Sequence, residues 1–196
     1  VAHEEAATDT SDVTAQVSRV DRADPDAVLV STVGGQIEVL YQNTAHSILD
    51  EDVQMFSLSS IGNQPQLWDQ ADEGALDGLV YVGTLTDDNP RLAEAREVFE
   101  EANGTDAVMT DYDAQAYNAV RMLATAIEDA GSAEPADVHA ALEQLSGFEA
   151  YFGLPEFTIS YEPGNHVGAD GACGVVFTQF EGGEPVGAWD RYQPSC

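Results

Sequence analysis

The chain has 196 residues, of which 36 are Asp or Glu and only 6 are Lys or Arg, so its formal net charge is −30 at pH 7. All six of these basic residues are arginines. Nucleic acids and anionic membranes bind proteins through basic surfaces, so this composition argues against both as partners. A hydrophobic fraction of 43% is nevertheless enough for a folded core.

The acidic surface has two interpretations. In about 1 M salt the Debye length falls to about 3 Å, so a lysine-free, acid-covered protein stays folded and soluble in brine, as halophiles require. The alternative is a surface that binds metal ions or a cationic partner. The acids occur in dispersed pairs such as Glu4-Glu5, Asp87-Asp88 and Glu100-Glu101, which favours a solvated surface. The sequence contains no zinc-type Cys pair and no phosphate-binding or nucleophile motif, so we expect no cofactor.

The first half of the sequence alternates between helical and strand-like segments. A helix is predicted over 11–24, and the apolar run over 26–32 is typical of a strand buried on both faces of a parallel sheet. The alternation continues with a helix over 37–48, a strand over 53–58, a helix over 65–73 and a strand over 79–82. This order predicts crossover units and a mostly parallel α/β sheet.

The second half is first helical and then strand-like. Helices are predicted over 90–102, 112–130 and 135–145, and strands over 156–161 and 175–180. A hairpin turn over 181–184 leads into a last strand that begins at Pro185. In the long helix one apolar stripe is predicted to face the core. It consists of Tyr117, Val120, Leu123, Ala124 and Ile127.

The candidate binding site follows from the parallel sheet, because ligands bind just beyond the carboxyl ends of such strands. Two segments, 32–35 and 59–62, lie at these ends. Serine hydroxyls there can donate or accept hydrogen bonds to a small solute, or they can simply cap the following helix. The candidate ligand-binding residues are Thr32, Val33, Gly34, Ser59 and Ser60.

Three passages of the sequence, in this order, resemble branched-chain amino-acid ABC-transporter substrate-binding proteins. They are Asp12-Val13-Thr14-Ala15-Gln16 with the passage over 23–28, then Ala75-Leu76-Asp77-Gly78-Leu79-Val80-Tyr81, then the helix from Ala116 to Ser132. The resemblance implies a type I periplasmic-binding-protein fold, in which two Rossmann-like lobes are joined by three hinge crossings. It also implies that only the C-terminal half of that fold is present, in a halophilic archaeal version.

The resemblance also implies how the chain is divided between the two lobes. Residues 1–83 would belong to the second lobe, 84–172 to the first lobe, and 173–196 would return to the second. Hinge crossings would lie near 84–86 and 165–173.

The function implied by this resemblance is that of a non-catalytic receptor, which delivers a small solute to the membrane subunits of an ABC permease. It would be extracellular and held at the cell surface by a lipid anchor outside these residues. Val33 stands where the family often has a Tyr that closes over the ligand, and Ser59 falls at or next to the Glu that receives the ligand ammonium. An amide or a urea-like solute is therefore an alternative to a branched-chain amino acid.

Two other functions remain open at this point. One is the ligand-sensing ectodomain of a signalling receptor on the same fold. The other is an α/β hydrolase-like enzyme that uses clustered carboxylates, for example those of Asp111 and Asp113. Cys173 and Cys196 would form a disulfide in a secreted protein and stay free thiols in a cytosolic one, and the extracellular location implied by the resemblance favours the disulfide.

Overall fold

The structure, a computed structural model, describes residues 1–169, 171–192 and 194. It consists of two compact units, which are described separately. Unit 1 comprises Val1–Gly83 and Phe177–Trp189, and unit 2 comprises Thr84–Val176 with the C-terminal residues from Asp190. The assignment of residues to the two lobes of the family fold stays a prediction.

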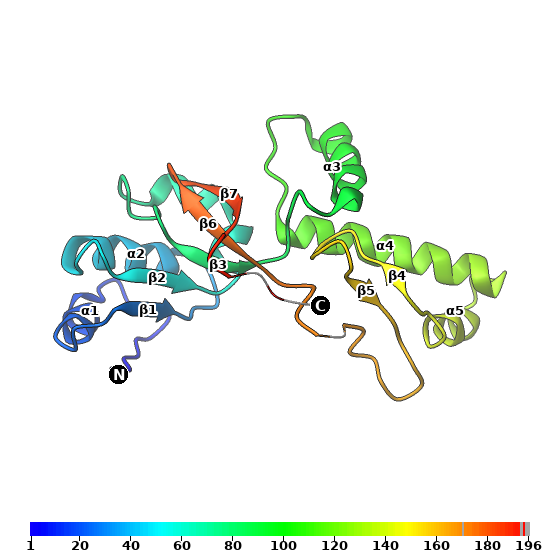
Figure 1. The fold of residues 1–196 in the computed structure, drawn as a ribbon, viewed down its shortest axis with the longest axis horizontal. Coiled ribbons are helices and arrows are strands. Elements are labelled where there is room, and N and C mark those ends of the chain that lie inside the picture. Colours follow the sequence, from blue (N-terminus) through cyan, green and yellow to red (C-terminus); the bar gives the residue numbers. More distant parts are fainter. Residues whose placement is uncertain (170, 193, 195–196) are drawn as a thin grey trace. The chain divides into compact units, whose positions relative to one another are not determined.

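Unit 1 is built on a five-stranded sheet with the order β1-β2-β3-β6-β7 (Figure 1). The strands β1 (Ala27–Val30), β2 (Gln54–Ser57) and β3 (Val80–Gly83) run parallel, as the alternating segments predict. The strand β7 (Glu184–Ala188) is antiparallel to β6 (Val176–Glu181), which confirms the predicted hairpin. The carboxyl ends of the parallel strands therefore meet at one edge of the sheet.

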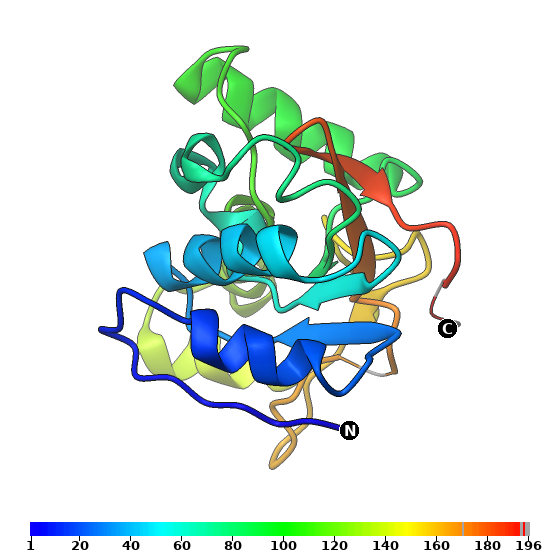
Figure 2. The same cartoon turned by 90° about the vertical axis from the view of Figure 1, so that its left-hand side faces the viewer.

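Two helices of unit 1, α1 (Thr14–Asp21) and α2 (Gln36–Ile48), lie side by side (Figure 2). Their contact is a small apolar cluster centred on Val13, Val17 and Ala45. At the start of α1 the Asp12 carboxylate accepts a hydrogen bond from the backbone N–H of Thr14 at 2.8 Å. This bond lowers the pKa of Asp12 below its ordinary value.

The segment between β2 and β3 differs from the prediction. The helix expected over 65–73 is a 3₁₀ helix, η2 (Pro65–Gln70), preceded by a shorter one, η1 (Ile61–Asn63). It ends at Gln70 because Ala71 is extended and the backbone N–H of Asp72 donates to the Asn43 side chain at 2.9 Å.

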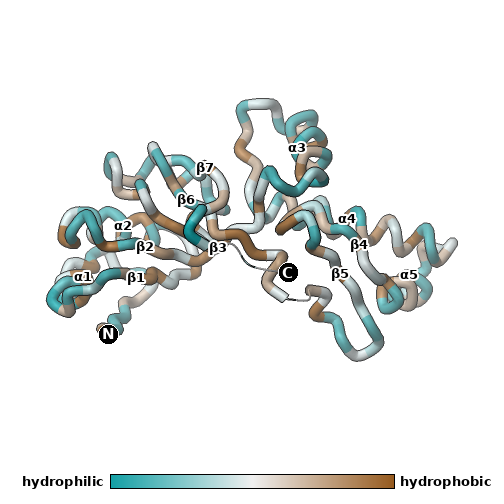
Figure 3. Tube along the Cα trace, viewed as in Figure 1, coloured by the Kyte–Doolittle hydropathy of each residue, from teal (hydrophilic) through white to brown (hydrophobic). Residues whose placement is uncertain are grey.

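The main core of unit 1 lies between this segment and the sheet. The Trp68 ring packs edge-on against Phe180 at 5.4 Å, and the Trp189 ring packs against Phe56 at 5.6 Å, so both tryptophans are packing residues. In Figure 3 hydrophobic and hydrophilic stretches follow one another along β6, whereas most of α1 is hydrophilic. The buried residues of this core are Val39, Ile61, Leu67, Leu76, Leu79, Tyr81 and Phe180.

Unit 2 contains three helices and a two-stranded antiparallel sheet. The helices are α3 (Pro90–Asn103), α4 (Asp111–Ala130) and α5 (Pro135–Leu142). The strand predicted over 156–161 is reduced to β5 (Thr158–Ile159), which pairs with the unpredicted β4 (Phe148–Glu149). The core of unit 2 consists of Met122, Leu145, Ala150, Phe157, Ile159 and Cys173.

Buried polar side chains hold the connections of unit 2 together. Asn89 begins α3 by accepting a hydrogen bond from the Arg91 N–H at 3.0 Å. Its amide also donates to the carbonyl oxygens of Ala150, Phe152 and Gly153 at 3.1–3.2 Å. One asparagine therefore caps a helix and satisfies a neighbouring loop.

The predicted inward face of α4 is wrong. The residues of α4 that are buried in unit 2 are Asp111, Ala114, Asn118, Met122 and Ala126. Three residues of the predicted stripe, Val120, Leu123 and Ile127, are exposed, Val120 at 65%. The helix carries apolar residues on two faces, and the described part of unit 2 covers only one of them. Among the described residues, no helix is long and apolar enough to span a membrane.

Candidate functional site

The loops after β1 and β2 meet in unit 1. Val30 at the end of β1 is paired in register with Ser57 at the end of β2, so both loops begin at the same level of the sheet. Gly34 has a positive φ of 87°, and a Cβ added to it would lie 3.3 Å from the Cβ of Ser60. The structure therefore brings the predicted residues of the two loops together, and glycine at this position permits the close approach.

The five predicted site residues differ in exposure and in hydrogen bonding. Val33 is 91% exposed, whereas Thr32, Gly34, Ser59 and Ser60 are partly buried. The Ser59 carbonyl accepts a hydrogen bond from the Asn63 side chain at 2.7 Å, which closes the turn after β2. The side-chain oxygen of Ser60 is buried and makes no hydrogen bond to any described residue.

The alternative role of these serines as helix caps is contradicted for Ser60. It occupies the N-cap position of η1, but its side chain makes no capping hydrogen bond. A buried hydroxyl without a partner costs about 1–3 kcal/mol, so the position favours a partner that is absent from the described chain. Two contacts hold the turn that follows Ser60 in place. Trp68 Nε1 donates to the Ile61 carbonyl at 2.8 Å, and Tyr81 packs on Gly62.

Behind the two loops lies a buried carboxylate, that of Glu38 in the first turn of α2. It accepts hydrogen bonds from the Thr32 hydroxyl, from Ser57 Oγ at 2.7 Å and from Gln42 Nε2 at 3.0 Å. These bonds connect both strand ends to α2. The carboxylate, the Ser57 hydroxyl and the Gln42 amide were not predicted as part of the site.

The sequence does carry a signal for this network. On α2 the inward positions include Glu38, Gln42 and Ala45, which follow the spacing of a helix face. Polar residues at such positions are buried only when they are hydrogen-bonded, so they mark an interior polar network. Composition obscured the signal, because Glu38 is one of 36 acids in the chain.

A groove of about 1100 Å³ borders the site within unit 1. It runs between β1 and the N-terminal segment, reaches the side of α1, and includes Thr32 and Val33 at one end. No described strand pairs with the groove side of β1. Leu29 of this strand is 62% exposed, so the groove has an apolar wall and a free strand edge.

The other carboxylate pairs considered in the sequence have structural roles. Asp111 accepts hydrogen bonds from the backbone N–H and the hydroxyl of Thr84 at 2.6 and 2.8 Å, and Asp113 forms a capping box with Thr110 at the start of α4. Glu4 accepts a hydrogen bond from Arg19 at 2.8 Å, which lowers the pKa of Glu4. In the described part of the chain no three His, Cys, Asp or Glu side chains are grouped so that they could hold a metal ion.

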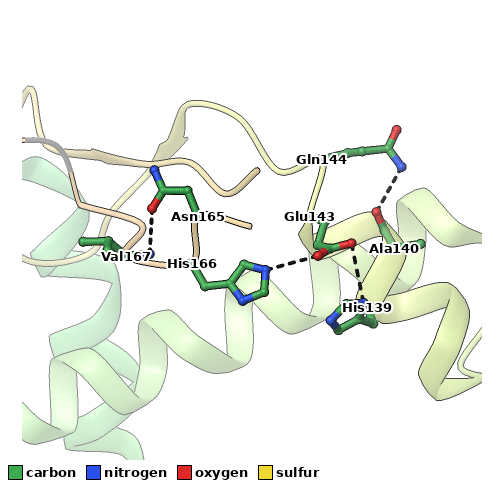
Figure 4. A network of polar contacts seen from close by, with 7 residues as sticks. All are labelled: His139, Ala140, Glu143, Gln144, Asn165, His166 and Val167. Atoms are coloured by element: carbon green, nitrogen blue, oxygen red, sulfur yellow. Dashed lines mark hydrogen bonds and ion pairs between the residues drawn. The ribbon is translucent and has the colours of Figure 1, made fainter. Parts of the chain in front are cut away.

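Unit 2 has a separate polar cluster on its surface (Figure 4). Glu143 lies 3.1 Å from His166 Nε2 and 3.7 Å from His139 Nδ1, so one carboxylate connects the end of α5 to the loop that carries His166. The Asn165 side chain accepts a hydrogen bond from the Val167 N–H at 3.2 Å. These contacts give Asn165 and His166 a structural role in this loop. The predicted disulfide partner Cys196 lies outside the described residues, so the pairing with Cys173 stays a prediction.

Several solved structures resemble this chain. A leucine-binding protein, LivK, from Thermotoga maritima has a TM-score of 0.71 and 21% sequence identity, covering 91% of this chain and 48% of that one. LivJ from Streptococcus pneumoniae, solved with isoleucine, has a TM-score of 0.73 and 15% sequence identity. The match covers 92% of this chain and 49% of LivJ. A solute-binding protein from R. palustris, solved with benzoate, has a TM-score of 0.67 and 15% sequence identity. The match covers 92% of this chain and 47% of that protein.

These similarities confirm the predicted fold, and the chain spans about half the length of the structures that it matches. Among curated proteins none matches the chain in sequence. Residues 1–181 match the family model described as a periplasmic binding protein, which is a family of binding proteins and not of enzymes. With a match over nearly its whole length, the chain belongs to the periplasmic binding protein family.

Proposed function

We propose that the chain is part of an extracellular receptor that binds a small polar organic solute and delivers it to the membrane subunits of an ABC permease. The observation that carries the proposal is the meeting of two hydroxyl-bearing loops at the carboxyl ends of β1 and β2, with the Ser60 hydroxyl left without a partner in the described chain. Parallel sheets bind ligands at this edge. Thr32, Val33, Gly34, Ser59 and Ser60 are the proposed contact residues.

The candidate solutes are branched-chain amino acids, amides and urea-like compounds. LivJ was solved with isoleucine and the R. palustris protein with benzoate, so proteins of this fold hold both amino acids and aromatic acids. The remaining contacts to the solute would come from residues outside these 196. Two exposed apolar surfaces support this part of the proposal: Leu29 on β1, and Val120 with Leu123 on α4. Soluble proteins cover large surfaces of this kind.

The cellular location is part of the same proposal. A receptor of this family would be extracellular and held at the cell surface by a lipid anchor outside these residues. The charge of −30 without a single lysine further suggests a protein adapted to brine. In dilute salt, repulsion among the acids would oppose the compact state.

Thermal unfolding of the full-length protein in molar salt tests the proposed function. The panel contains leucine, isoleucine, benzoate, simple amides and urea derivatives. A solute that binds only the folded state at about 1,000 times its Kd adds about 4 kcal/mol of stability, so it raises the melting temperature by several degrees. If no solute in the panel raises the melting temperature, the receptor proposal fails.

A further inference from the structure

The buried carboxylate of Glu38 is unusual because no cation among the described residues pairs with it. None of the described ion pairs includes Glu38, and its side chain is fully buried. Three hydrogen-bond donors surround it instead, from Thr32, Ser57 and Gln42. Its place in the first turn of α2 adds the partial positive charge of a helix N-terminus. Together these groups replace the water that an ionised carboxylate loses on burial.

This arrangement determines what the Thr32 hydroxyl can do. The Thr32 hydroxyl donates its hydrogen bond to the Glu38 carboxyl group, so the hydroxyl proton points toward Glu38. The Thr32 oxygen also accepts a hydrogen bond from the Gly34 N–H at 3.4 Å. One lone pair remains for a ligand. Thr32 can therefore accept a hydrogen bond from a solute but cannot donate one.

We propose that Glu38 is a positioning residue of the binding site, which makes Thr32 an obligatory acceptor and selects solutes that present an N–H donor to the ends of β1 and β2. This inference rests on the proposed function of that site. An ammonium or amide group would be attracted there, because a buried negative charge lies one hydroxyl away. A carboxylate at the same place would meet an acceptor and a like charge. The nitrogen-bearing end of the solute therefore faces these loops.

The sequence resemblance implies that Ser59 or a neighbouring residue stands where the family has the acid that receives the ammonium. Glu38 supplies negative charge near the same strand ends from a different element, the first turn of α2. The charge acts through the Thr32 hydroxyl, because Glu38 itself is fully buried. We therefore expect that a solute needs an N–H donor to bind here, even though no acid contacts the solute directly.

Calorimetric titration of the full-length protein and its Glu38→Gln variant tests the inference. The probes are L-leucine and 4-methylpentanoate, which is leucine without its ammonium group. A glutamine side chain at this position that turns its NH₂ toward Thr32 reverses that hydrogen bond, so the variant should bind leucine about tenfold more weakly, the equivalent of one hydrogen bond. Binding of 4-methylpentanoate should change by less than about threefold. An equal loss of affinity for both probes, or no loss of affinity for leucine, would overturn the inference.

Three further variants separate positioning from general stability. Gln42→Met removes one hydrogen bond to Glu38 but leaves that of Thr32, so the ratio of the two affinities should stay within about twofold of wild type. Thr32→Val should shift the ratio in the same direction as Glu38→Gln, and Thr32→Ser, which keeps the hydroxyl, should restore it. A ratio that follows the melting temperature across all four variants would contradict a positioning role.

A measurement without ligand distinguishes this inference from the proposed function. In a double-mutant cycle of Thr32→Val and Glu38→Gln, the shifts in melting temperature should be non-additive, because the two side chains share one hydrogen bond. Additive shifts would overturn the inference whatever the protein binds. If the wild-type protein binds neither probe nor any amide or urea of the panel, the proposed function fails, and the selection by Glu38 fails with it.

Discussion

The Tyr81 ring lies directly against Gly62, so closely that a Cβ on Gly62 would be 2.1 Å from Tyr81 Cε2. Tyr81 belongs to β3 and Gly62 to η1, the turn that follows the candidate site loop. The contact therefore holds this loop against the core of unit 1, where Tyr81 also packs on Phe180 at 5.5 Å.

Replacing Gly62 by alanine should destabilise the protein, because the added methyl group forces the Tyr81 ring out of its position. Overpacking of this kind costs about 1–3 kcal/mol. The free energy of unfolding can be measured with urea in molar NaCl. Gly78→Ala is the control, since a Cβ there has no neighbour within 4 Å and only the positive φ is disfavoured. A Gly62→Ala variant as stable as wild type would refute the close contact.

Replacing Ser60 by alanine should separate stability from binding. The Ser60 hydroxyl has no partner in the described chain, so its removal should leave the free energy of unfolding unchanged or raise it. Solute binding should weaken about tenfold, the equivalent of one lost hydrogen bond. Ser57→Ala is the matched variant: it removes a donor from the buried Glu38 carboxylate and should cost about 1–3 kcal/mol. Loss of stability in Ser60→Ala with unchanged binding would assign this serine a purely structural role.

Dilution of salt should destabilise the protein. With a net charge of −30, repulsion grows as NaCl falls below about 0.5 M and the Debye length lengthens. The melting temperature should fall with each dilution. Glu97 and Glu101 are exposed one turn apart on α3, so a variant with glutamine at both positions should depend less on salt than wild type. A melting temperature that does not change on dilution would contradict the adaptation to brine.

The cysteines should be linked. Mass spectrometry of the unreduced protein should show a mass lower by two hydrogens than that of the reduced protein, and a cross-linked peptide containing Cys173 and Cys196. A loop of this length is expected to contribute about 3 kcal/mol, so reduction should lower the melting temperature. Labelling of two thiols by iodoacetamide in the unreduced, denatured protein would disprove the link.

The fold was predictable where a single physical signal dominates. The apolar run at β1 indicated a strand of a parallel sheet, and the alternation up to β3 gave the correct crossover order. The predicted burial of β1 on both faces is wrong, because β1 is an edge strand of the described sheet and Leu29 is 62% exposed. The inward face of α4 was not predictable, because the apolar spacing of Val120, Leu123 and Ile127 indicates that a face is to be covered without showing by what. The extent of β5 was not predictable either, because only Thr158 and Ile159 pair with β4, and Ile159 also forms an isolated bridge to Ala169.

The candidate site was only partly predictable. Strand ends and loop composition indicated Thr32, Gly34 and Ser60, because these depend on local sequence and on one general rule about parallel sheets. The network around Glu38 depends on three elements that meet only in the folded chain. In a sequence with 36 acids, the helical spacing of Glu38 and Gln42 does not single out this buried carboxylate.

The location of the binding site can be tested most directly by hydrogen–deuterium exchange of the full-length protein. Exchange would be compared with and without the solute that raises the melting temperature most. We expect slower exchange on binding in the loops over 31–36 and 58–64, with little change in α1 and β7. Protection that is absent from both loops and appears elsewhere in unit 1 would contradict the proposed site.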